Sequence, residues 1–148
     1  LGFDVLAVDT DPDKVALLAR GVVPFREPGL DDLLARHVAS GRLRFTTDLA
    51  EAAALADVHF ICVGTPQSSD GLAADVSAVY EVARGLAQHA TSDCLIVGKS
   101  TVPVGTTQQL TALVGSAASA GVISSGSSGT GAPTGGWARA TTSRSSRR

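Results

Sequence analysis

An acidic residue, Asp9, follows the apolar run Val5-Leu6-Ala7-Val8 and precedes Asp11-Pro12, a pair typical of a helix start. The apolar run is typical of a buried strand, so Asp9 should lie at the carboxyl end of that strand. In dinucleotide-binding folds, a carboxylate at the end of the second strand accepts hydrogen bonds from both hydroxyls of an adenosine ribose. The same position suits an aspartate that only shapes a turn or caps a helix, and position alone leaves both roles open.

Two loops of small and hydroxyl-bearing residues follow two further apolar runs. The first is Val63-Gly64-Thr65-Pro66-Gln67, and the second is Lys99-Ser100-Thr101-Val102-Pro103-Val104-Gly105-Thr106. Because the carboxyl ends of parallel strands share one edge of a sheet, both loops should lie where open α/β folds bind ligands. Ordinary turns favour the same residue types, so each loop by itself indicates a site only weakly.

Two other motif matches fail at required positions. The segment Asp9–Asp13 resembles the start of a calcium loop, but Lys14 replaces its glycine and Arg20 replaces its glutamate. Gly98-Lys99-Ser100 resembles the end of a nucleoside-triphosphate loop, but Asp93 stands where the first glycine is required. We therefore expect neither a metal site nor an NTPase.

The elements that would hold these residues alternate between strands and helices. Strands are expected at Val5–Val8, Leu43–Phe45, Val58–Val63 and Cys94–Val97. Helices are expected from Pro12 to Gly21, from Pro28 to Gly41, after Asp48 with a capping box to Glu51, after Asp75, and from Gly105 to Val114. This alternation predicts an α/β fold with a parallel sheet covered on both faces.

Composition narrows the class of protein. The chain has 148 residues and a net charge of -2, which argues against a general nucleic-acid binder. No apolar run is long enough to span a membrane and no signal peptide is visible, so we expect a cytoplasmic protein without membrane contact. Cys62 and Cys94 lie in apolar runs, which predicts two buried, reduced core cysteines.

The composition changes near residue 115, where a stretch rich in Ser, Gly, Thr and Arg begins. Such a stretch buries too little apolar surface to offset its ordering entropy. We therefore predict two parts, a folded domain over residues 1–114 and a disordered tail over residues 115–148.

Five segments of this chain, in this order, resemble the UDP-glucose/GDP-mannose dehydrogenase family, and most of all its members that oxidise UDP-glucose. The resemblance covers about residues 1–114 and is carried by Val8-Asp9-Thr10-Asp11 with Lys14, Pro24-Phe25-Arg26-Glu27-Pro28-Gly29-Leu30, Phe45-Thr46-Thr47-Asp48, Val63-Gly64-Thr65-Pro66, and Ser100-Thr101-Val102-Pro103-Val104-Gly105-Thr106.

This resemblance implies a Rossmann-like, doubly wound fold and NAD as cofactor. It implies that the family oxidises the primary alcohol of a nucleotide sugar to a carboxylate, with UDP-glucose giving UDP-glucuronate. It implies that Asp9 and Lys14 contact the adenosine ribose. It also implies that Thr101 lies near the nicotinamide and helps to position a water, which makes Thr101 the one catalytic candidate. The remaining implied NAD-binding residues are Val63, Gly64, Thr65, Pro66 and Ser100.

The chain also departs from the family pattern. The glycine-rich turn should lie about 20 residues before the acid, but only eight residues precede Asp9, so we expect the first strand and that turn to be missing. The family's nucleophilic cysteine and its central dimer helix also have no counterpart here. Without the first strand, the strands on either side of it lose their shared neighbour, which predicts a marginally folded chain.

We therefore expect a fragment that is inactive as given, from a family of homodimers that bind nucleotide sugars. Three alternatives stay open. The parent enzyme could act on GDP-mannose or UDP-N-acetylmannosamine, the chain could be a non-catalytic nucleotide-binding module, or it could be the product of a broken gene, for example after a frameshift.

Overall fold

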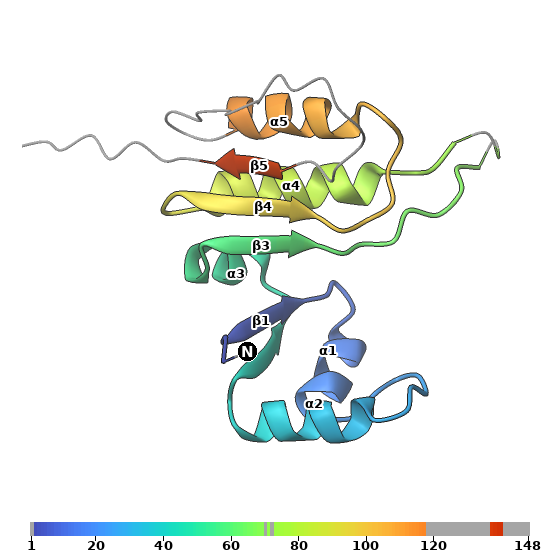
Figure 1. Ribbon diagram of the computed structural model, residues 1–148, viewed down its shortest axis with the longest axis vertical. Helices are drawn as coiled ribbons and strands as arrows, with labels where there is room; N and C mark the ends of the chain where they lie inside the picture. The colour runs from blue at the N-terminus through green and yellow to red at the C-terminus, as the bar shows by residue number, and fades with distance from the viewer. Residues whose placement is uncertain (1, 70, 72, 118–136, 141–148) are drawn as a thin grey trace, which may run out of the picture. The chain divides into compact units, whose positions relative to one another are not determined.

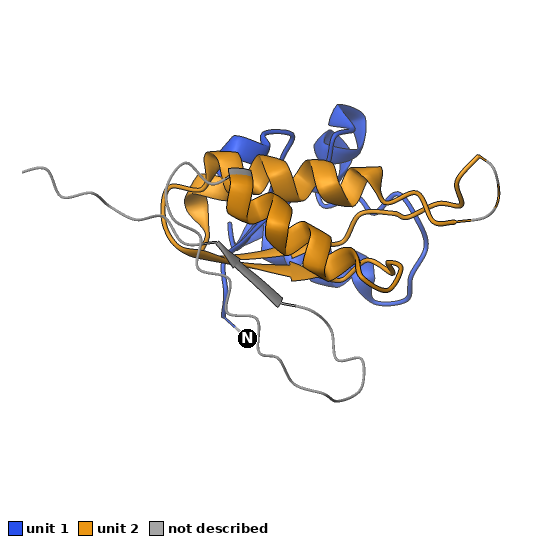
Figure 2. Cartoon of the chain, turned by 90° about the horizontal axis from the view of Figure 1, so that it is seen from above, with its two compact units in different colours: residues 1–52 blue, residues 53–148 orange. Residues whose placement is uncertain are grey.

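The computed structural model describes residues 2–69, 71, 73–117 and 137–140 (Figure 1). Its elements are β1 (Val5–Val8), α1 (Pro12–Ala19), α2 (Leu30–Ala39), β2 (Leu43–Thr46), α3 (Leu49–Leu55), β3 (Val58–Ile61), α4 (Ser77–His89), β4 (Cys94–Gly98), α5 (Thr106–Ala117) and β5 (Trp137–Ala140). The chain divides into two compact units, Leu1–Ala52 and Ala53–Arg148 (Figure 2). Over the described residues, no helix combines the length and the hydropathy that crossing a membrane requires.

The first unit is a parallel pair of strands with a helical crossover. β1 and β2 pair from Val5 with Leu43 to Val8 with Thr46. Asp11 caps α1 as expected, because its side chain accepts hydrogen bonds from the backbone N–H groups of Asp13 and Lys14. α2 begins two residues later than Pro28, because Gly29 before it has a left-handed backbone with φ of 82°.

The second unit repeats this arrangement. β3 and β4 pair in parallel from Val58 with Leu95 to Ile61 with Gly98, and α4 is the crossover between them. α4 and α5 lie side by side (Figure 2). The hydroxyl of Tyr80 on α4 donates a hydrogen bond to the Gln109 side chain on α5. The core of this unit is small and aliphatic, as the composition predicts, and includes Ile61, Val79, Ala83, Leu86, Ala87, Ile96, Val97 and Val114.

The expected α/β fold with parallel strands is confirmed, but its strands are less buried than expected. The five described strands form two separate sheets, in the orders β1-β2 and β3-β4-β5. Among the described strands, β1 and β3 do not pair with each other. The predicted burial of both sheet faces is wrong at Val5 and Phe60, which are 49% and 63% exposed, because no described element covers those side chains.

One predicted core cysteine is not in the core. β3 ends at Ile61 rather than Val63, so Cys62 belongs to the following loop and is exposed. Cys94 lies in β4 and is buried as expected. An apolar run shows where a strand is, but it does not show at which residue the pairing stops.

Two described segments extend into the region expected to be a tail, residues 115–148. α5 continues to Ala117 rather than ending at Val114. Trp137–Ala140 forms β5 and pairs antiparallel with β4. The remainder of the predicted tail, residues 118–136 and 141–148, lies outside the described residues.

Buried His59 on β3 is expected to make the stability of the second unit sensitive to pH. The residue is only 8% exposed, and its Nε2 has no hydrogen-bond partner among the described residues. Burial lowers the pKa of His59 below its ordinary value of 6.5, so the folded state favours neutral imidazole. The unfolded state therefore binds the proton more readily, and the free energy of unfolding should fall as the pH drops from 6.5 toward the lowered value.

Urea unfolding followed between neutral pH and pH about 5 tests this expectation. His59→Leu should make the free energy of unfolding less dependent on pH over that range. His89→Gln, at the exposed end of α4 in the same unit, is the matched control. An identical pH dependence in the wild type and in His59→Leu would contradict the assignment.

Candidate functional site

Asp9 and Lys14 form an ion pair in the first unit. Asp9 directly follows β1, and its Oδ1 accepts a hydrogen bond of 3.1 Å from the backbone N–H of Asp11. Lys14 lies in the first turn of α1, and its Nζ bonds to Oδ2 of Asp9. Because Asp11 caps the helix, the turn brings Lys14 back over the end of the strand. The sequence suggested both residues for one site, and the structure brings them into direct contact.

This pair fixes the charge of the carboxylate. The Lys14 hydrogen bond, followed by that from the Asp11 backbone, lowers the pKa of Asp9 below its ordinary range. The same contact raises the pKa of Lys14. The side chain of Asp9 remains 31% exposed, so its carboxylate can accept further hydrogen bonds from a ligand. Asp9 thus shapes the turn and still presents an ionised acceptor at the strand end.

The two predicted loops lie together in the second unit. The backbone N–H of Lys99 donates to the carbonyl of Ile61 at 2.9 Å. Farther out, the Ser100 hydroxyl donates to the Val63 carbonyl at 2.7 Å, and the Thr65 hydroxyl donates to the Thr101 carbonyl at 2.9 Å. These contacts bring together all six predicted residues of this edge, namely Val63, Gly64, Thr65, Pro66, Ser100 and Thr101. The sequence did not predict the hydroxyl–carbonyl bonds, because no pattern reveals which carbonyl a Ser or Thr will reach.

The backbone of this edge is open to a ligand. A Cβ placed on Gly64 or on Gly98 would meet no other atom within 4 Å. A hollow of about 340 Å³ lies beside the first loop and is lined by Thr65, Gln67, Ala73 and Ala74. Glycines with free space in front of them allow a ligand to approach the main chain, which is what a cofactor-binding edge requires.

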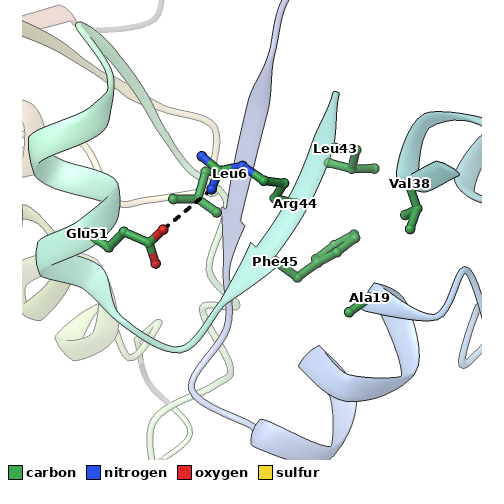
Figure 3. A pocket seen from close by; sticks show the side chains of 7 residues that line it. All are labelled: Leu6, Ala19, Val38, Leu43, Arg44, Phe45 and Glu51. Atoms are coloured by element: carbon green, nitrogen blue, oxygen red, sulfur yellow. Dashed lines mark ion pairs between the residues drawn. The ribbon is translucent and has the colours of Figure 1, made fainter. Parts of the chain in front are cut away.

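A cavity of about 310 Å³ in the first unit does not involve the predicted site (Figure 3). Leu43 and Phe45 point toward Val38 and Ala19, whereas Arg44 points the other way, toward Glu51 at 3.7 Å. None of the predicted site residues lines this space. Its walls are mainly apolar and its one ion pair is exposed, so it offers few groups that could orient a ligand.

Comparison with known proteins identifies the origin of this arrangement. The family model described as "UDP-glucose/GDP-mannose dehydrogenase family, NAD binding domain" matches residues 1–125. The UDP-glucose 6-dehydrogenase of Rhizobium meliloti (strain 1021) is 48% identical over 113 residues, which make up 76% of this chain and 26% of that protein. The GDP-mannose 6-dehydrogenase of Pseudomonas savastanoi pv. phaseolicola is 42% identical over 105 residues, or 69% of this chain and 24% of that protein.

Solved structures give the same result. A GDP-mannose dehydrogenase from Pseudomonas aeruginosa superposes with a TM-score of 0.75 at 35% identity, over 79% of this chain and 28% of that one. A UDP-glucose dehydrogenase from Pyrobaculum islandicum gives 0.70 at 37% identity, with the same coverage of 79% and 28%. The chain thus spans about a quarter of the length of these relatives. These matches confirm the expected Rossmann-like fold and NAD as the cofactor. The chain belongs to the UDP-glucose/GDP-mannose dehydrogenase family and corresponds to its NAD-binding domain.

Proposed function

We propose that this chain holds NAD within a dehydrogenase that oxidises UDP-glucose to UDP-glucuronate. The observation that carries the proposal is the ionised carboxylate of Asp9 at the carboxyl end of β1, with Lys14 bonded to one of its oxygens. A fixed, partly exposed carboxylate suits the two hydroxyls of an adenosine ribose. It disfavours a ribose that carries a phosphate, because like charges repel.

The two loops of the second unit are also proposed to contact NAD, because their residues match those implied by the family resemblance. In the loop after β3, Gly64 leaves space for a ligand, and Thr65 and Pro66 follow it. In the loop after β4, Thr101 is exposed. When bound, NAD accepts a hydride from the carbon that carries the sugar alcohol. Thr101 is proposed to help orient the water that the second oxidation consumes.

The described cysteines do not fit the covalent step of such an oxidation. Cys94 is buried in β4, and burial raises the pKa of its thiol. A nucleophilic cysteine needs the opposite shift, because the thiolate is the reactive form. Cys62 is exposed beside the first loop but does not match the family nucleophile. We therefore propose that this chain alone binds NAD and does not oxidise a sugar.

Binding is tested by calorimetry of the 148-residue chain with NAD and, as matched control, NADP. NAD should bind, and NADP should bind at least about tenfold more weakly, because its 2′-phosphate faces the Asp9 carboxylate. Equal affinities, or no binding of NAD, would contradict the assignment of Asp9.

The choice of sugar is tested on a protein that spans the full length of the relatives, because this chain covers only about a quarter of them. UDP-glucose is the first candidate and GDP-mannose the second, since relatives named for both substrates match this chain. NADH formation with UDP-glucose, GDP-mannose and UDP-N-acetylmannosamine would rank them by kcat/KM. A preference for either alternative sugar would leave the NAD assignment intact and change only the substrate.

Gly64→Ala should weaken NAD binding by about tenfold or more without destabilising the fold. The added methyl group meets no atom within 4 Å, and Gly64 does not have a positive φ, so the substitution causes neither a clash nor strain. It does occupy the space in front of the loop where the cofactor is expected. Thermal unfolding and NAD calorimetry on the same sample separate the two effects. Unchanged affinity would show that no ligand approaches this glycine.

A further inference from the structure

The hydroxyls of Ser100 and Thr65 bond reciprocally across the two loops of the second unit. The Ser100 hydroxyl, on the loop after β4, donates to a carbonyl of the loop after β3. The Thr65 hydroxyl, on the loop after β3, donates to a carbonyl of the loop after β4. We name this pair of bonds the cross-tie. It joins residues that are 36 and 37 positions apart in the sequence, so it is not a local turn contact.

The cross-tie extends the pairing of β3 and β4 beyond the strands themselves. The backbone ladder reaches the bond from Lys99 N–H to the Ile61 carbonyl. At the next carbonyl on that side, Val63, the donor is the Ser100 side chain instead of a backbone N–H. The same hydroxyl lies 3.4 Å from the Ile61 carbonyl, too far to compete with the bond of 2.7 Å. At this position a side-chain hydroxyl replaces the backbone N–H as the donor between the two segments.

We propose that Ser100 and Thr65 are positioning residues that hold the two loops at one fixed spacing, and that Ser100 acts through Val63 and Gly64 rather than by touching the cofactor. Ser100 is half-buried and its one hydroxyl proton is engaged by the Val63 carbonyl, whereas Thr101 beside it is exposed. The cross-tie therefore sets the position of the open backbone at Gly64. Loops that are already fixed lose less conformational entropy when a ligand binds. This inference rests on the proposed binding of NAD.

The test compares Ser100→Ala with two matched variants of the whole chain. Ser100→Ala should weaken NAD binding by about tenfold, because one half of the cross-tie is lost. Ser100→Thr keeps the hydroxyl and should restore the affinity to within about twofold. Ser116→Ala removes a hydroxyl that bonds at 2.8 Å to the Leu113 carbonyl within α5, and it should bind NAD as the wild type does.

AMP distinguishes positioning from general destabilisation, because AMP carries the adenosine ribose assigned to Asp9 and lacks the half of NAD assigned to the loops. Ser100→Ala should leave AMP affinity unchanged while NAD affinity falls. An equal loss for both ligands, an unchanged NAD affinity, or no rescue by Ser100→Thr would overturn the proposal.

Hydrogen exchange gives a measurement that needs no ligand. The Lys99 amide is protected by its bond to the Ile61 carbonyl, next to the cross-tie. In Ser100→Ala this end of the ladder should fray, and the Lys99 amide should exchange about tenfold faster, with no such change in Ser116→Ala. If the wild type fails to bind NAD, the proposed function fails, and the exchange result decides the cross-tie alone. An unchanged rate at Lys99 would overturn it.

Discussion

Asp9→Ala is expected to lower the affinity of this chain for NAD by at least about a hundredfold. The carboxylate is proposed to accept two hydrogen bonds from the adenosine ribose, and hydrogen bonds to a charged group contribute about 1.5–3 kcal/mol each. The effect on stability should be small, because the Asp9–Lys14 pair is partly exposed and such pairs contribute about 0–1 kcal/mol. Calorimetry gives the affinity, and urea unfolding of the same protein gives the stability.

Asp13→Ala is the matched control for this experiment. Asp13 lies in the same first turn of α1 and is exposed, so its loss removes an equal charge without touching the strand end. It should change NAD affinity by less than about threefold. If Asp9→Ala binds NAD as tightly as Asp13→Ala does, then Asp9 only shapes the turn through its bond to the Asp11 N–H.

The pH dependence of binding gives a second check on Asp9. The Lys14 hydrogen bond lowers the pKa of Asp9, so its carboxylate stays ionised as the pH falls to the ordinary aspartate value of 3.8. NAD affinity should therefore persist wherever both units remain folded. In Lys14→Ala the carboxylate loses that support, and the affinity should begin to fall at a higher pH than in the wild type.

The sequence predicted those parts of the fold that depend on local chemistry. Asp11 followed by Pro12 correctly placed the start of α1, because a capping side chain and a proline suit the first turn whatever surrounds them. Gly21, with φ of 76°, follows the end of that helix as expected. The parallel pairing followed from the alternation of strands and helices, since each crossover helix returns the chain to the same edge.

The sequence did not reveal contacts with partners that lie outside a local motif. Glu51 follows Asp48 at capping-box spacing, yet its carboxylate pairs with Arg44 on β2. Asp48 nevertheless caps α3 alone, accepting from the Ala50 and Glu51 N–H groups. Similarly, β5 pairs with β4 from more than 35 residues away, and no local pattern announces such a partner.

In the candidate site, too, some features could be predicted from the sequence and others could not. Asp9 and the two loops could be selected from their residue types and their place after predicted strands, because parallel strands direct their carboxyl ends to one edge. The bond from Ser100 to Val63 could not be selected in this way, and it changes the proposed role of Ser100 from a ligand contact to a positioning residue. Type and order indicate where a site lies, whereas hydrogen-bond partners decide what each residue does there.

Leu86→Ala is expected to destabilise the second unit by about 2–5 kcal/mol. Leu86 is 3% exposed on α4, and removing its side chain both loses buried apolar surface and leaves a cavity among small neighbours. Leu55→Ala makes the same chemical change at a residue of this unit that is 55% exposed, so it should cost less than about 1 kcal/mol. Urea unfolding and hydrogen exchange of α4 amides measure both variants.

The size of the Leu86→Ala effect also tests how close this chain is to unfolding. The strands form two small sheets, and Val5 and Phe60 stay exposed where a larger sheet would bury them. Both features reduce the apolar burial that offsets chain entropy, so the total stability should lie at or below the usual range of about 5–15 kcal/mol. A loss of 2–5 kcal/mol should then abolish cooperative unfolding in Leu86→Ala but not in Leu55→Ala. A cooperative transition with a large enthalpy in Leu86→Ala would contradict this expectation. It would show that the core of the second unit is stable enough to hold its two loops in place without further strands.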